Sequence, residues 1–104
     1  MGREELLGEI KGALEEAYGR RLRRIVLYGS EARGEQRPDS DIDVLVLLSG
    51  PIRLWEDLRA SLLALYPLSL RLGRPISPKP VDVREYEAGT CPLYRRAEAE
   101  GVSA

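Results

Sequence analysis

The chain lacks histidine entirely and contains a single cysteine, Cys91. Without histidine, neither a Ser-His or Cys-His catalytic pair nor a histidine-ligated zinc site can form. One cysteine excludes an intramolecular disulfide, and Cys91 without a histidine partner is typical of an inert, small apolar side chain. A long apolar run is also missing, and Glu4 and Glu5 stand near the start. We therefore expect no signal peptide, no membrane span and a cytoplasmic protein.

An excess of charge of one sign is also absent. The chain carries 16 basic and 17 acidic residues, for a net charge of −1. Domains that bind nucleic acid broadly usually show a basic patch and a high pI. We therefore expect no broad nucleic-acid surface, whereas a nucleotide or a protein substrate remains open. The 104 residues suffice for one modest core, and we assign residues 1–104 to a single domain.

Helical periodicity and short apolar runs alternate along the chain. The pattern predicts helices over residues 3–18, 31–34, 54–66 and 91–100, and strands over 22–28, 42–48, 68–72 and 80–84. Four prolines within residues 67–80 favour short extended pieces there, because proline interrupts a helix. The strand over 42–48 is apolar at nearly every position past its start, as expected of a strand covered on both faces. The fold class predicted is α/β (α+β).

Two features of the segment 28–46 carry the candidate chemistry. Gly29-Ser30 follows the first strand, and Asp41 and Asp43 stand at the start of the next one. Strand positions two apart share a face, so these carboxylates should project side by side, roughly 6–7 Å apart. Their repulsion would push one toward protonation, and a divalent cation such as Mg²⁺ removes the conflict. Backbone N–H groups and the hydroxyl at the Gly29-Ser30 turn suit a phosphate, so the segment predicts a metal–nucleotide site.

Each of these residues also has a plainer interpretation. Ser30 fits the N-cap of an ordinary turn, and the two aspartates fit solvated charge at a strand entrance. Asp39, next to Pro38 and Ser40, fits loop chemistry better than a site. Aspartate is disfavoured in strands, so two on one face of a buried strand favour the metal. Ser30 is not expected to be a nucleophile, because no histidine can activate it.

The combined motif resembles the signature of the polymerase-beta-like nucleotidyltransferase superfamily. The resemblance rests on Gly29-Ser30, Ala32-Arg33-Gly34, Asp39-Ser40 and Asp41-Ile42-Asp43. It is specific over residues 25–48, and the chain is similar in size to the smallest members, the minimal nucleotidyltransferases. It implies a small mixed β-sheet with helices packed on it, in the order αβαβαβα.

The resemblance also implies an activity. A magnesium-dependent enzyme would move a nucleoside monophosphate, AMP in the first instance, from ATP or another NTP to an acceptor hydroxyl. Gly29 and Ser30 would bind the β/γ-phosphates, and Arg33 could clamp them, since guanidinium suits phosphate oxygens. Asp41 and Asp43 would hold one Mg²⁺ against the triphosphate.

Members of the superfamily use a third carboxylate on the neighbouring strand, and the resemblance implies that it shares a second Mg²⁺ with the acid pair. Asp82 is the candidate, because β-branched valines flank it on both sides. Asp82 followed by Glu85 three residues later also fits a helix cap. Both interpretations of Asp82 remain open.

The resemblance further implies a protein partner. Small relatives are commonly encoded beside a helical partner of the HEPN type, as the antitoxin of a toxin–antitoxin pair. There the nucleotidyltransferase adds AMP to a tyrosine of the toxin or neutralises it by binding. We therefore expect a protein acceptor over nucleic acid, with Trp55 in the core or at a partner interface. A non-catalytic binding subunit and an enzyme for small molecules remain alternative functions, and a homo-oligomer remains possible. Asp82 discriminates catalysis from the binding subunit: a place within reach of Asp41 and Asp43 favours catalysis, and a capping role favours binding.

Overall fold

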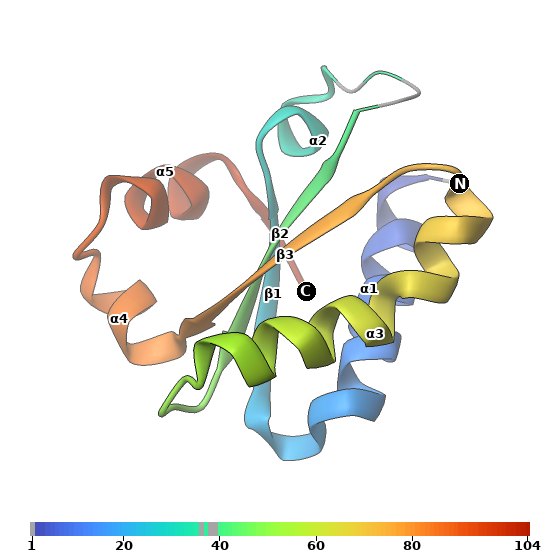
Figure 1. The fold of residues 1–104 in the computed structure, drawn as a ribbon. Helices are drawn as coiled ribbons and strands as arrows, with labels where there is room; N and C mark the ends of the chain where they lie inside the picture. Colours follow the sequence, from blue (N-terminus) through green and yellow to red (C-terminus); the bar gives the residue numbers. More distant parts are fainter. Residues whose placement is uncertain (1, 36, 38–39) are drawn as a thin grey trace.

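The computed structural model describes residues 2–35, 37 and 40–104. A four-stranded sheet forms its centre, with helices on both faces (Figure 1). In chain order the elements are α1 (Arg3–Tyr18), the 3-10 helix η1 (Gly19–Arg21), β1 (Leu22–Tyr28), α2 (Ser30–Arg33), β2 (Ile42–Leu48), α3 (Leu54–Leu72), β3 (Ile76–Asp82), α4 (Val83–Ala88), α5 (Pro92–Glu100) and β4 (Val102–Ser103).

The sheet is mixed and has the strand order β3-β2-β1-β4. β1 pairs antiparallel with both β2 and β4, whereas β3 runs parallel to β2 after the crossover through α3. Helices α1 and α3 cover one face of the sheet, and α4 and α5 cover the other (Figure 1). The predicted small mixed sheet with packed helices is confirmed.

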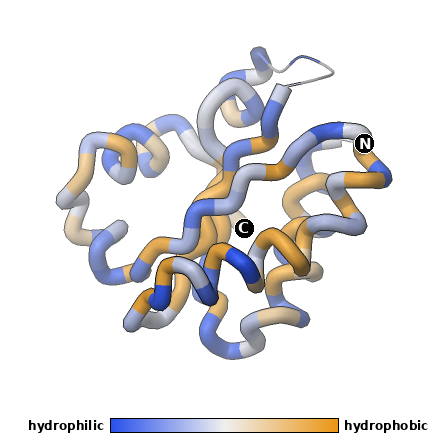
Figure 2. Tube along the Cα trace, viewed as in Figure 1, coloured by the Kyte–Doolittle hydropathy of each residue, from blue (hydrophilic) through white to orange (hydrophobic). Residues whose placement is uncertain are grey.

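Hydrophobic residues fill two cores, one on each face of the sheet (Figure 2). Alternate residues of β2 serve the two cores, because successive strand side chains point to opposite faces. Val44 and Val46 pack toward α1 and α3, while Leu45 and Leu47 pack toward α4 and α5. This double coverage explains why β2 is a continuous apolar run, as its sequence indicates.

Most of the predicted elements match the structure closely. The helix over 3–18 and the strands over 22–28 and 42–48 have the predicted bounds, and α2 and α5 begin within a residue of the prediction. The expected loop over 37–40 includes Pro38 and Asp39, which lie outside the described residues. No helix in the described part of the chain is long and apolar enough to cross a membrane.

The strand predicted over residues 68–72 is wrong, because α3 continues through Pro67 to Leu72. Leu65 and Leu68 are buried and Leu72 packs against the same core, so the helical spacing of three and four persists past the proline. Pro67 is exposed. The carbonyl that loses its helical partner there can reach solvent, and burial of the apolar face outweighs that single lost hydrogen bond.

The predicted strand over 80–84 is displaced. β3 begins at Ile76 and ends at Asp82, and Val83 already belongs to α4. Pro78 and Pro80 are tolerated because β3 lies at the sheet edge, where only one side of the strand needs its N–H donors. The two prolines are two residues apart, so their missing donors point to the same side. α4 and the short β4 were not predicted.

Candidate functional site

The candidate site lies at one end of the sheet, where β1 ends and β2 and β3 begin. Tyr28 is the register partner of Asp43 on one side, and Ser77 is its partner on the other. Asp43 shares its face with Leu45 and Leu47, so its side chain points toward the face that α4 and α5 cover. Three neighbouring strands therefore contribute to one small region.

Gly29 brings the turn after β1 directly against a carboxylate. Its φ of +70° lies in a region that side chains disfavour, and a Cβ there would stand 2.8 Å from Asp43 Oδ2. Glycine thus allows both the turn and the close approach. Ser30 follows as the first residue of α2, whose single turn is closed by Arg33 N–H donating to the Gly29 carbonyl at 3.2 Å. The predicted turn and the predicted acid pair do converge.

Asp41 and Asp43 are close enough for the charge on one to act on the other. Burial, with a further contribution from the charge on Asp41, raises the pKa of Asp43. Burial and then the charge on Asp43 raise the pKa of Tyr28. Among the described residues, no lysine or arginine forms an ion pair with either aspartate. Asp41, which is exposed, has one long contact, 3.5 Å from Oδ2 to the Ser77 hydroxyl.

A buried ion pair fixes the backbone that carries these aspartates. Arg74, in the turn before β3, donates at 2.7 Å to Glu31 of α2, and Glu31 is almost fully buried. The same guanidinium donates to the Ser40 carbonyl at 3.0 Å and to the Ser40 hydroxyl at 3.2 Å. Arg74 therefore links α2 to Ser40, the residue that precedes Asp41. Its ion pair is with Glu31 and not with Asp41 or Asp43.

Arg33 lies beside a small pocket that opens at Gly29. The pocket has a volume of about 190 Å³ and lies between the end of β1 and α5, with Arg96 and Glu100 among its lining residues. Arg33 is half-exposed and contacts Glu35 at 3.4 Å and Glu100 at 4.0 Å. Its guanidinium is thus near the turn, held by two exposed carboxylates that a phosphate could replace.

Asp82 does not join the acid pair. It is the register partner of Leu48, at the opposite end of β2, about 16 Å along the strand from the position beside Asp43. Its carboxylate caps α4 by accepting from Arg84 N–H at 2.9 Å and lies against Gly50. The structure therefore supports the alternative in which Asp82 caps a helix. The prediction that Asp82 shares a metal ion with Asp41 and Asp43 is wrong. Sequence placed Asp82 too early in the strand, because the prolines obscured where β3 begins.

Sequence reasoning missed Ser77, Arg74 and Arg96. A predicted strand that begins at Ile76 would have pointed to Ser77, because parallel pairing with β2 places Ser77 beside Asp43. Arg74 and Arg96 carry no motif, and only their tertiary contacts distinguish them from surface arginines.

Residues 7–102 match the sequence profile of the family described as a nucleotidyltransferase domain. The chain belongs to this nucleotidyltransferase family. The resemblance to a minimal nucleotidyltransferase is thereby confirmed. A candidate protein adenylyltransferase of Methanocaldococcus jannaschii is 40% identical over 47 residues, which cover 45% of this chain and 47% of that protein. The matched segment thus spans about half the length of that relative.

Solved structures show the same fold. One described as a minimal nucleotidyltransferase is 27% identical, with a TM-score of 0.56 over 98% of this chain and 95% of its own. A toxin–antitoxin structure with AMP-PNP is 21% identical, with a TM-score of 0.65 over 92% of this chain and 69% of that one. A second toxin–antitoxin structure, of MntA-HpeT, is 17% identical with a TM-score of 0.58, over the whole of this chain and 72% of that one.

Proposed function

We propose that this nucleotidyltransferase domain transfers AMP from ATP to a hydroxyl of a protein partner, with Mg²⁺ as the cofactor. One observation carries the proposal: the carboxylate of Asp43 lies against the backbone of Gly29. The acid pair and the turn proposed to bind phosphate therefore lie next to each other. An adenylyltransferase relative and a structural neighbour with AMP-PNP support adenine as the base.

The donor set of the acid pair suits a single Mg²⁺ that arrives with a nucleotide. Magnesium is commonly bound through one or two carboxylates together with substrate phosphates and water. Asp41 and Asp43 supply two carboxylates; burial and then the charge on Asp41 raise the pKa of Asp43, and a bound cation would favour its ionised form. When bound, the ion neutralises phosphate charge and polarises the phosphorus–oxygen bond.

The chain's own groups have separate tasks around the triphosphate. The Gly29-Ser30 turn offers backbone N–H groups to the phosphates, and the glycine leaves room for their approach. Arg33 would exchange its contacts with Glu35 and Glu100 for the departing pyrophosphate. Ser30 binds and does not attack, because the chain has no histidine to activate it and the acceptor supplies the nucleophile.

A protein acceptor is favoured by the surface of α3. Within the described part of the chain, the large apolar residues that are well exposed all lie on this helix: Leu54, Trp55, Leu62, Leu63, Tyr66 and Leu70. Trp55 is 77% exposed and so does not lie in the core, which supports the other predicted place, a partner interface. Two structural neighbours are toxin–antitoxin structures. We propose a HEPN-type helical protein as the occupant of this face and the acceptor of AMP.

A second candidate function is a binding subunit that retains the fold and neutralises its partner without transfer. The observation that favours it is the distance of Asp82 from the acid pair, which removes the third carboxylate that the family resemblance implied. In this case the exposed face of α3 alone would carry the function.

Labelled ATP, Mg²⁺ and the product of the adjacent gene separate the two candidates. Intact-mass analysis should show AMP added to the partner with wild-type protein and with Asp82→Asn, and none with Asp43→Asn. A stable complex without added AMP would favour the binding subunit. A Trp55→Glu variant should lose complex formation in size-exclusion chromatography; if the variant binds as wild type does, α3 is not the interface.

A further inference from the structure

Ser77 is the residue of β3 that faces the acid pair. It is the register partner of Asp43 across the parallel β2–β3 ladder, and paired strands lie about 4.8 Å apart. Its hydroxyl lies 3.5 Å from Asp41 Oδ2. Ile76, on the alternate face, packs into the α1–α3 core, so Ser77 points with Asp43 toward the other face.

This place on the neighbouring strand is where a third carboxylate would complete a site for two cations. The described residues contain no cluster of three or more carboxylate, cysteine or histidine side chains suited to a metal. Asp82 occupies the far end of the same strand, where it caps α4. A two-ion site places its cations about 3.5–4 Å apart, so it needs ligands that both ions share.

We infer that the site holds one Mg²⁺ per chain, with the neutral hydroxyl of Ser77 in the position of the missing third ligand. The inference rests on the proposed function, since the ion is taken to arrive with the nucleotide. Two carboxylates together with substrate phosphates are the usual donor set for one Mg²⁺, and the Ser77 hydroxyl donates to Asp41 without supplying a further carboxylate. The plainer alternative is that Ser77 is only an edge-strand residue with no bearing on the ion.

A carboxylate at this position should convert the site. In Ser77→Asp, three carboxylates from adjacent strands would face one another, which is the arrangement that a second cation needs. Ser77 is partly exposed on an edge strand, so the larger side chain has access to solvent and to the acid pair. Ser77→Ala is the matched control, because it removes the hydroxyl and adds no charge.

The test counts bound ions directly. Equilibrium dialysis with Mn²⁺ and saturating α,β-methylene ATP, which cannot undergo transfer, should give one Mn²⁺ per wild-type chain. Ser77→Asp should give two, while Ser77→Ala and Asp82→Asn should give one. Transfer by Ser77→Asp should rise at least tenfold over wild type.

Two ions on the wild type, or one ion on a folded Ser77→Asp, would overturn the inference and leave the proposed function standing. No ion on the wild type would instead refute the proposed function, and the inference with it. Circular dichroism reports whether Ser77→Asp folds, and the wild-type and Asp82→Asn counts decide the question if it does not.

Discussion

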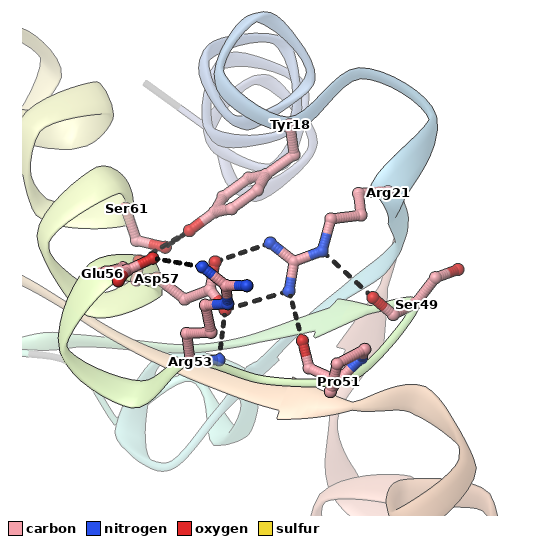
Figure 3. A network of polar contacts seen from close by, with 8 residues as sticks. All are labelled: Tyr18, Arg21, Ser49, Pro51, Arg53, Glu56, Asp57 and Ser61. Carbon is pink, nitrogen blue, oxygen red and sulfur yellow. Dashed lines mark hydrogen bonds and ion pairs between the residues drawn. The ribbon is translucent and has the colours of Figure 1, made fainter.

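The carboxylates near the two ends of the sheet differ in whether an arginine pairs with them. At the end where β1 begins, Asp57 accepts two hydrogen bonds from Arg21, at 2.7 and 2.9 Å, and one from Arg53 N–H at 2.9 Å (Figure 3). Tyr18 joins the network by donating to the Asp57 carbonyl and bonding the Ser61 hydroxyl. At the other end, the charge on Asp41 acts on Asp43, and neither aspartate forms an ion pair with a lysine or arginine among the described residues.

The arginine at each end explains the difference. Arg21 pairs directly with the carboxylate of Asp57, and this pairing lowers the pKa of Asp57. Arg74 instead pairs with Glu31 and the backbone at Ser40, so it holds the scaffold around Asp41 and leaves the aspartates unpaired. A satisfied carboxylate stabilises the fold, whereas an unsatisfied pair is available to a ligand.

Asp43→Asn tests the functional end and should have the largest effect. Transfer should fall at least about 100-fold, because a lost metal ligand costs several kcal/mol in the transition state. The free energy of unfolding should stay equal or rise slightly, since the change removes a repelled charge. Initial rates with labelled ATP, and urea unfolding followed by circular dichroism, measure both. Wild-type rates in the variant would refute the assignment.

Asp57→Ala tests the structural end. Asp57 is almost fully buried and its partner is partly exposed, so the free energy of unfolding should fall by about 2–4 kcal/mol. The loss comes from leaving Arg21 and the Arg53 N–H without their acceptor. Below the lowered melting temperature, binding of the ATP analogue should remain within about twofold of wild type. A selective loss of nucleotide binding in a folded variant would show that the two ends are coupled.

The turn and the acid pair could be predicted from sequence, but the Arg21–Asp57 pair and the register of β3 could not. The turn at Gly29 and the strand start at Asp43 could be predicted, because each depends on residues that are adjacent in the sequence. The pairing of Arg21 with Asp57 spans 36 positions, and no pattern in the chain marks it. The strand register that separates Asp82 from the acid pair depends on where β3 begins, which Pro75, Pro78 and Pro80 concealed.

Gly29→Ala and Gly19→Ala form a matched pair with a smaller expected effect. Both glycines combine a positive φ, +70° and +57°, with a ψ of −146° and −130°, a backbone conformation that other residues rarely adopt, so each substitution should cost about 1–3 kcal/mol of stability. Only the Cβ at Gly29 would meet Asp43 Oδ2, while nothing lies within 4 Å at Gly19. Nucleotide affinity should therefore fall in Gly29→Ala and stay unchanged in Gly19→Ala. Equal affinities in the two variants would separate the turn from the site.

The pH dependence should be the smallest effect, with opposite signs at the two ends. Because the pKa of Asp57 is lowered, its stabilisation is present above its ordinary pKa and is lost as the pH falls through the lowered value. Because the pKa of Asp43 is raised, its ionised form costs stability at neutral pH, and that cost disappears as the pH falls through the raised value.

Urea unfolding between about pH 7 and about pH 3 measures this difference. Asp57→Asn should be less stable than wild type and Asp43→Asn equally or more stable at the upper end. Both differences should shrink in acid. Two differences of the same sign would mean that the carboxylates are not held in opposite ways.

A broad hollow between α1 and α3 is not part of either end. It has a volume of about 810 Å³, and residues of α1 and α3 such as Gly8, Gly12, Ala64 and Pro67 line it. It lies on the α1–α3 side of the sheet, away from the face to which Asp43 points. The site therefore follows from its charges and turn geometry and not from the size of a depression.

A crystal structure with Mn²⁺ and α,β-methylene ATP tests the central claim most directly. We predict an anomalous scattering peak between the carboxylates of Asp41 and Asp43, with the triphosphate against the Gly29-Ser30 turn. A nucleotide bound in the α1–α3 groove, or a peak that contacts neither aspartate, would contradict the account.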